Sequence, residues 1–142
     1  MATVLSSTAL AVGAVVAVAN PAAAADPNFT FAYHSAGGGS FSIVVYNNGR
    51  EAGLAYFQAD PSAGATPGDA INATDRLEDG WGIRAVMVSP EHREATTSGH
   101  PAKYTSPWVT GDIKEGTAIE MYACATKSGS SYCSLTYSGG VA

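Results

Sequence analysis

The first 25 residues of this chain of 142 carry no charged side chain, because every Asp, Glu, Lys and Arg lies further along. Within this stretch Ala9–Ala19 is apolar, and it is followed by Asn-Pro and then by four alanines that end at Ala25. A membrane-spanning helix needs about 20 apolar residues, so this run is too short to be one. A short apolar run, a breaker and an Ala-x-Ala site are typical of a secretory signal peptide. We therefore expect residues 1–25 to be a signal peptide and the mature protein to be secreted and extracellular.

Basic residues are scarce as well: seven Lys and Arg stand against twelve Asp and Glu, for a net charge of −5. They are spread from Arg50 to Lys127 and form no cluster. Binding to nucleic acid or to anionic lipid depends on clustered Lys and Arg. We therefore expect neither a nucleic-acid partner nor a membrane partner.

Motifs that identify a reaction are also missing, including a nucleophile elbow, a His-Glu-x-x-His zinc motif, an EF-hand loop and a phosphate-binding loop. Gly37-Gly38-Gly39 lacks the Lys and the helix that a phosphate site needs. Two polar segments, Glu91–Glu94 with His100 and Asp75–Gly80, have spacings that fit no common metal site. We interpret both as solvated loops, and we expect a protein that is not an enzyme and holds no cofactor or metal.

The two cysteines, Cys124 and Cys133, are expected to form one disulfide in an exported protein. Taking Ser128-Gly129 as a two-residue turn gives an antiparallel hairpin in which the two cysteines face each other. They form a non-hydrogen-bonded pair, whose Cα atoms are close enough for a disulfide. The turn and the cysteines thus indicate the same register.

Beyond the leader, apolar residues alternate with a period of two, and Gly, Pro, Asn and Asp interrupt them, which predicts an all-β protein. Asn48-Gly49 is the strongest turn signal, since both central residues of a type I′ turn need positive φ. Centring a hairpin there predicts three apolar pairs on one face: Val45–Ala52, Ile43–Leu54 and Phe41–Tyr56. Further strands are predicted at 70–74, 82–89 and 103–109, with loops at 60–68 and 91–101.

About seven short strands separated by turns favour a small antiparallel β-sandwich. The segment Glu115–Cys124 resembles the sixth strand of immunoglobulin-like domains, in which a Tyr lies two residues before a Cys. In that family the disulfide partner of this Cys lies on an early strand across the core, whereas here the partner, Cys133, lies on the next strand. We expect a single sandwich domain over residues 40–142.

The mature N-terminus carries the main functional prediction. Phe29, Phe31 and Tyr33 alternate, so they share one face of a strand, and His34 follows them. The glycines at 37–39 then separate this segment from the next strand. Residues 26–39 are therefore predicted to be an extended arm on a Gly-rich tether, with Phe29, Phe31, Tyr33 and His34 binding a protein partner. The alternative is an ordinary first strand of the domain's own sheet.

The chain resembles the small exported β-proteins of Streptomyces and related actinobacteria. The resemblance rests on the Ala-rich leader, the Asp79–Gly82 segment, Glu115-Gly116-Thr117 and the hairpin that contains Cys124 and Cys133. One subset that is similar in plan comprises the adaptor subunits of secreted umbrella toxin particles. The resemblance implies an adaptor that joins a secreted lectin to a toxin scaffold through an N-terminal strand.

Two other functions fit the composition. A secreted hydrolase inhibitor would present a loop such as His92–Pro107, although the disulfide lies on a different hairpin. A carbohydrate-binding module would use an exposed indole of Trp81 or Trp108, whereas two buried indoles would fill the core.

Overall fold

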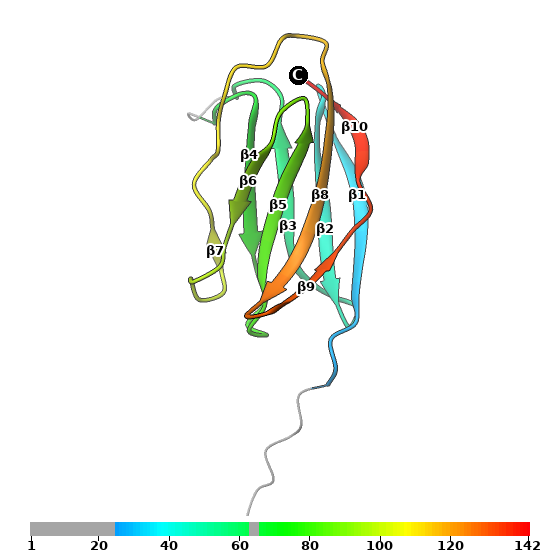
Figure 1. The fold of residues 1–142 in the computed structure, drawn as a ribbon, viewed down its shortest axis with the longest axis vertical. Helices are drawn as coiled ribbons and strands as arrows, with labels where there is room; N and C mark the ends of the chain where they lie inside the picture. Colours follow the sequence, from blue (N-terminus) through cyan, green and yellow to red (C-terminus); the bar gives the residue numbers. More distant parts are fainter. Residues whose placement is uncertain (1–24, 63–65) are drawn as a thin grey trace, which may run out of the picture.

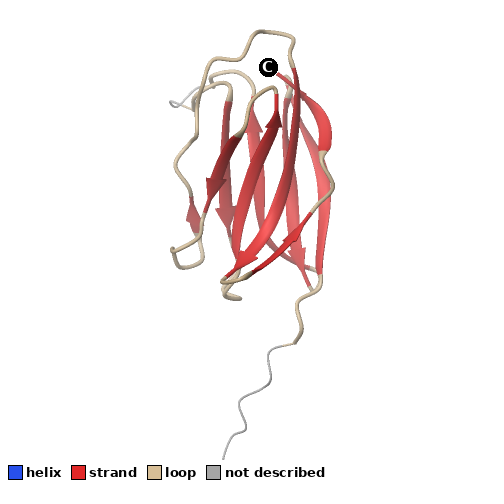
Figure 2. Cartoon of the chain, viewed as in Figure 1, coloured by secondary structure: helices blue, strands red, loops and turns tan. Residues whose placement is uncertain are grey.

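The computed structural model describes residues 25–62 and 66–142. In this part of the chain, ten strands form two antiparallel sheets that pack face to face, with no helix among them (Figures 1 and 2). The predicted all-β sandwich with a hairpin disulfide is therefore confirmed. Nothing in these two ranges forms a helix long and apolar enough to cross a bilayer. The predicted leader lies outside the described residues except for Ala25.

The first sheet has the order β1-β2-β3-β4-β7, and the second has the order β10-β8-β5-β6 with β9 also paired to β8. β10 pairs with residues 118–121 of β8 and β9 with residues 124–127, so these two short strands follow one another along the same side of β8. The strands are β1 (Phe29–Gly37), β2 (Ser40–Asn47), β3 (Arg50–Gln58), β4 (Ala70–Asp75), β5 (Gly82–Ser89), β6 (Arg93–Thr96), β7 (Tyr104–Thr105), β8 (Ala118–Lys127), β9 (Ser130–Cys133) and β10 (Tyr137–Val141).

The core fills the space between the two sheets. Successive side chains of a strand point to opposite faces, and β2 alternates between buried and half-buried residues over most of its length. The largest fully buried side chains come from both sheets, and burial of these apolar groups is the main driving force for folding. They include Phe41, Ile43, Phe57, Ile71, Ile83, Met87, Ile119 and Met121.

The β2–β3 hairpin turns at Asn48-Gly49 as predicted, with φ of 50° and 75° at the two residues. The predicted register is correct for the pairs next to the turn and wrong for the remaining pairs. A β-bulge at Ala52 shifts the rest of β3 by one residue relative to β2. The predicted pairs Val45–Ala52, Ile43–Leu54 and Phe41–Tyr56 are replaced by Val45–Gly53, Ile43–Ala55 and Phe41–Phe57.

The bulge decides which side chains of β3 are buried. A shift of one residue moves alternate side chains to the other face of a sheet. Phe57 is therefore fully buried, and Tyr56 is half-buried on the outer face. Gly53 follows the bulge, where a Cβ would collide with the carbonyl of Thr74 and lie 2.7 Å from Cγ1 of Ile83. Only glycine fits so close an approach between β3, β4 and the facing sheet.

The β8–β9 hairpin has the predicted register throughout, with Lys127 opposite Ser130 and Cys124 opposite Cys133. The disulfide forms between the two cysteines, whose Cα atoms are 4.0 Å apart. The disulfide therefore joins neighbouring strands of one sheet and does not connect the two sheets.

Elsewhere the predicted strands are partly corrected. β5 has the predicted bounds and β4 is one residue longer than predicted. The predicted 91–101 loop contains β6, and the predicted 103–109 strand is reduced to β7 and an isolated bridge between Val109 and Ile71. β10 is a strand that the sequence did not indicate, since two of its five residues are glycines.

The predicted division between an arm at 26–39 and a domain at 40–142 is also wrong. β1 is an integral strand of the first sheet, because it pairs with β2 along its whole length (Figure 1). The predicted tether is the turn of this hairpin, and Gly38 and Gly39 have φ of 55° and 80°. Two consecutive residues with positive φ form the tight turn that joins two twisted strands. The alternative of an ordinary first strand therefore holds.

Replacing Phe57 by Ala should lower the free energy of unfolding by about 3–5 kcal/mol, because a large side chain is removed from the core. The matched change Tyr56→Ala should cost less, since that ring lies on the outer face. Urea unfolding of both variants measures the difference. Equal losses, or a larger loss for Tyr56→Ala, would contradict the bulged register.

Replacing both Cys124 and Cys133 by Ala should lower the free energy of unfolding by about 2.7 kcal/mol, the chain-entropy value for a closed loop of about ten residues. Because the hairpin register is also held by its turn and its ladder, the variant should keep a β-type circular dichroism spectrum. Thermal and urea denaturation at the same pH provide the comparison. A loss of the fold would show that the disulfide is needed for β8 and β9 to pair. Its role would then exceed a reduction in the conformational entropy of the unfolded chain.

Candidate functional site

Three of the four residues predicted to bind a partner pack against the protein's own core. Phe29, Phe31 and Tyr33 have half-buried side chains that contact the core cluster. His34 is exposed, on the opposite face of the same strand. These aromatic rings are therefore part of the sandwich, which corrects the expectation of anchors on a free arm.

The rings of β1 close one side of the sandwich against the second sheet. Phe29 lies 5.1 Å from Trp81 and 5.3 Å from Tyr132, measured between ring centroids, and Trp81 and Tyr132 are 5.4 Å apart. Further along the strand, Tyr33 lies 5.8 Å from Tyr137, and its hydroxyl donates a hydrogen bond to the carbonyl of Gly139 at 3.2 Å. We call this line of contacts between β1 and β9–β10 the seam.

The outer edge of β1 is left unpaired by this arrangement. The amide of Asn48 donates to the carbonyl of Asn28, so the hydrogen-bonded pairs with β2 involve every second residue from Asn28 onward. The backbone groups of Phe29, Phe31 and Tyr33 then point away from β2. Within the described part of the chain, β1 pairs with no other strand.

Other edges of the two sheets are shorter or covered. Ser106 and Val109 hydrogen-bond to Ala73 and Ile71 and so cover β4 next to the short strand β7. β6 has four residues, and residues 134–136 separate β9 from β10. Leu135 lies in that gap beside the seam and is 82% exposed, the most exposed large apolar side chain among the described residues.

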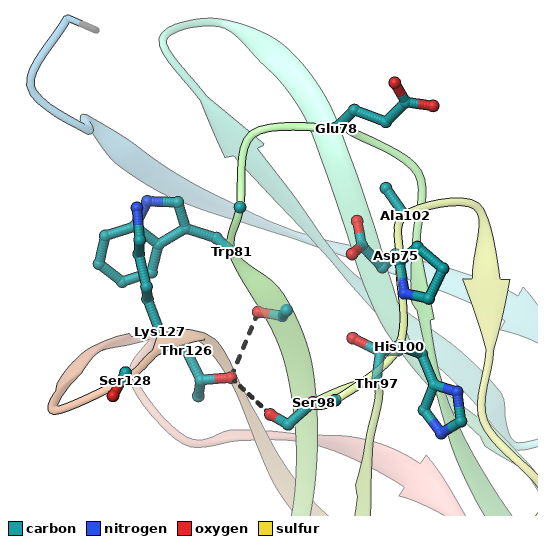
Figure 3. Close-up of a pocket in the computed structure, with 14 residues that line it drawn as sticks. Asp75, Glu78, Trp81, Thr97, Ser98, His100, Ala102, Thr126, Lys127 and Ser128 are labelled. Atoms are coloured by element: carbon teal, nitrogen blue, oxygen red, sulfur yellow. Dashed lines mark hydrogen bonds between the residues drawn. The ribbon is translucent and has the colours of Figure 1, made fainter.

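A cleft of about 760 Å³ opens at one end of the sandwich, where β4 and β5, β6 and β7, and β8 and β9 are connected (Figure 3). Its size falls within the usual range of small-molecule sites. Side chains from all three connections line it: Asp75, Glu78, Trp81, Thr97, Ser98, His100, Pro101, Ala102, Thr126, Lys127 and Ser128.

Asp75, the last residue of β4, carries the most unusual group of the cleft. The residue is only 3% exposed, and its Oδ1 accepts a hydrogen bond from the amide of Leu77 at 3.1 Å. Burial raises the pKa of the Asp75 carboxyl above its ordinary value, and the nearby Asp79 raises it further, whereas the Leu77 amide lowers it. Among the described residues, no side chain or backbone group forms an ion pair with Asp75 or hydrogen-bonds to its Oδ2.

Trp81 forms the opposite wall of the cleft. The amide of Trp81 donates to Oδ1 of Asp79 at 2.9 Å, and Oδ2 of Asp79 accepts from the side chain of Asn47 at 2.7 Å. These bonds hold the segment before β5. The ammonium of Lys127 lies 5.7 Å from the centre of the indole, within the range of a cation–π contact.

Hydroxyl groups line the floor of the cleft. The hydroxyl of Thr97 is buried and accepts a hydrogen bond from the amide of Ile83 at 2.8 Å. The hydroxyls of Ser98 and Thr126 lie 3.3 Å apart. The dashed lines in Figure 3 mark this contact and the hydrogen bond from Thr126 to the carbonyl of Gly82. His100 stands at the rim, with its ring stacked on that of Tyr104 at 3.8 Å.

The other sequence candidates lie elsewhere or have structural roles. Arg93 is 6% exposed and donates to the carbonyl of Asp69 and to Glu91, so it holds two loops together. Trp108 packs against Tyr56. The segment 92–107 contains β6 and β7 and is therefore not one continuous loop. In the described ranges, no three His, Cys, Asp or Glu side chains are close enough to hold a metal ion.

Sequence reasoning missed the cleft as a unit. The sequence places Asp75 and His100 in separate loops, and it does not connect Trp81 with either of them. No spacing in the sequence indicates that Lys127 lies against Trp81, since the turn that follows β8 brings it there. The one signal for Asp75 in the sequence is its place directly after the predicted strand 70–74, in phase with the apolar Ile71 and Ala73.

No protein-family model matches the chain, and neither the curated proteins nor the solved structures gave a significant match.

Replacing Asp75 by Asn should stabilise the protein at pH 7, because it removes a carboxylate that burial disfavours. The folded pKa is raised above 3.8, so the folded state binds more protons than the unfolded chain as the pH rises past that value. The stabilisation by Asp75→Asn should therefore shrink as the pH falls to about 4. Urea unfolding at both pH values measures this.

The control for this experiment is Asp112→Asn, since Asp112 is exposed. That variant should change stability little at either pH. A loss of stability in Asp75→Asn at neutral pH, or a gain that does not depend on pH, would contradict the account of Asp75.

Proposed function

We propose that this protein is a secreted, non-enzymatic interaction module that binds an extended segment of a partner protein along the free edge of β1. Addition of a strand to an exposed sheet edge is a common mode of peptide recognition, in which main-chain hydrogen bonds supply affinity. The observation that carries the proposal is the unpaired row of backbone groups on β1, the longest uncovered edge strand among the described residues.

The composition of β1 supports this function. Natural proteins protect exposed edges with Lys, Pro, inward charges or very short strands. β1 has nine residues, Phe-Thr-Phe-Ala-Tyr-His-Ser-Ala-Gly, and contains no Asp, Glu, Lys, Arg or Pro. Such an edge favours pairing with another chain.

The seam also supports a rigid docking edge. Phe29 and Tyr33 fix β1 against the second sheet, so the strand does not have to become ordered when a partner binds. Preorganisation of this kind improves affinity because less conformational entropy is lost on binding. The exposed Leu135 beside the seam offers an apolar contact for a side chain of the added strand.

Secretion and the adaptor role remain parts of this proposal. The charge-free leader and the disulfide support an extracellular location. The resemblance to toxin-particle adaptors suggests a secreted lectin or a toxin scaffold as the partner. The proposal changes the predicted mechanism in one respect, because β1 stays in its own sheet and receives a strand on its outer edge.

Amide exchange measured by NMR on the free protein should alternate along β1. The amides of Thr30, Ala32 and His34 should exchange slowly, because they bond to β2, and those of Phe31 and Tyr33 should exchange at least tenfold faster. Uniformly slow exchange that persists on dilution would contradict a free edge. Uniform protection that disappears on dilution would identify a second copy of this chain as the strand that pairs with β1, in place of a different protein.

A photo-reactive amino acid at His34, on β1, should cross-link the partner from the secretions of the source organism, and mass spectrometry should map the site to one extended segment. The same amino acid at Thr105, exposed on the opposite edge of the sheet, is the matched control. The double change Thr30→Lys and Ser35→Pro should reduce capture about tenfold or more, because edge charges and a missing donor oppose pairing. Capture that is equal at both edges, or unchanged in the double variant, would contradict the proposal.

A further inference from the structure

The cleft at the end of the sandwich contains a binding group that the fold itself does not use. Asp75 is only 3% exposed, but its Oδ2 is not fully buried and has no hydrogen-bond partner among the described residues. In Figure 3 its carboxylate points toward the space that Trp81, Thr97 and Ala102 surround. This oxygen keeps its capacity to accept a hydrogen bond, and a hydroxyl or amide of a ligand in the cleft could supply the donor.

The cleft carries charged groups of both signs, so a ligand of either net charge meets at least one repelling group. Asp75 and Glu78 lie on one wall, and Lys127 lies on the other. A cationic ligand is repelled by the ammonium of Lys127, which already occupies a position over the indole of Trp81. An anionic ligand is repelled by the two carboxylates. A neutral molecule with several hydroxyl groups can donate to Asp75 and accept from Lys127 at the same time.

The remaining lining groups fit the two kinds of surface that a sugar ring presents. Ser98, Thr126 and Ser128 supply hydroxyls that both donate and accept. The half-buried indole of Trp81 and the side chains of Pro101 and Ala102 supply apolar contact for the C–H face of a ring. The volume of about 760 Å³ has room for one or two sugar units.

We infer that this cleft binds a neutral saccharide, with the carboxylate of Asp75 accepting hydrogen bonds from ring hydroxyls and Trp81 contacting the apolar face of the ring. The site is separate from the outer edge of β1. It therefore does not depend on the proposed partner strand, and either proposal can fail without the other.

The test uses saturation-transfer NMR of the full mature protein with six probes. The methyl glycosides of glucose, galactose and mannose and N-acetylglucosamine are the neutral probes, and glucuronate and glucosamine are the anionic and cationic comparators. At least one neutral probe should bind with a dissociation constant of about 10 mM or lower, tighter than either charged probe. Asp75→Asn, which is expected to fold, should weaken that binding at least tenfold.

A second variant, Ser98→Trp, fills part of the cleft from an exposed position in its lining and should also abolish binding. The matched control is Trp108→Phe, since Trp108 packs against Tyr56 on the outer face of the first sheet and does not line the cleft, and this variant should bind as the parent does. Three results would overturn the inference: no binding of any neutral probe, tighter binding of a charged probe, or neutral binding that both cleft variants retain.

Discussion

The packing of the β1 rings against β9 and β10 links the fold to the proposed function. Side chains and backbone hydrogen-bonding groups of a strand are oriented by the same two-residue period. Once Phe29, Phe31 and Tyr33 face the core, their own amides and carbonyls must point away from β2. The contact that closes the sandwich on this side is therefore also what leaves its edge open to a partner strand. In a free arm, the rings would not close the core, and the open edge of the strand would not depend on their packing.

Glycine positions make this packing possible. A Cβ at Gly139 would collide with the ring of Tyr33, and one at Gly140 would collide with the ring of Phe41. β10 has glycines at these two positions, and the absence of side chains there leaves room for rings from the first sheet. This explains why a segment with weak strand propensity still pairs with β8, since tertiary packing outweighs intrinsic preference at such positions.

The cleft arises at the end of the sandwich because three connections meet there. Trp81 belongs both to the seam, through Phe29 and Tyr132, and to the cleft wall. Asp75 is buried at this end without an ion pair in the described residues, and proteins commonly tolerate such a cost where a site is functional. The two candidate surfaces are thus separate in space but share one indole as a structural element.

Local chemistry in the sequence was enough to predict the all-β class, the turns at Asn48-Gly49 and Ser128-Gly129, and the pairing of Cys124 with Cys133. Each of these depends on residues fewer than about ten positions apart, where φ preferences and alternation decide the outcome. The bulge at Ala52, the role of β1 and the group formed by Asp75, Trp81 and Lys127 were decided by the tertiary structure. They depend on which side chains are buried when the two sheets pack and on loops that come together only after this packing. Neither effect produces a periodic pattern in the amino-acid sequence.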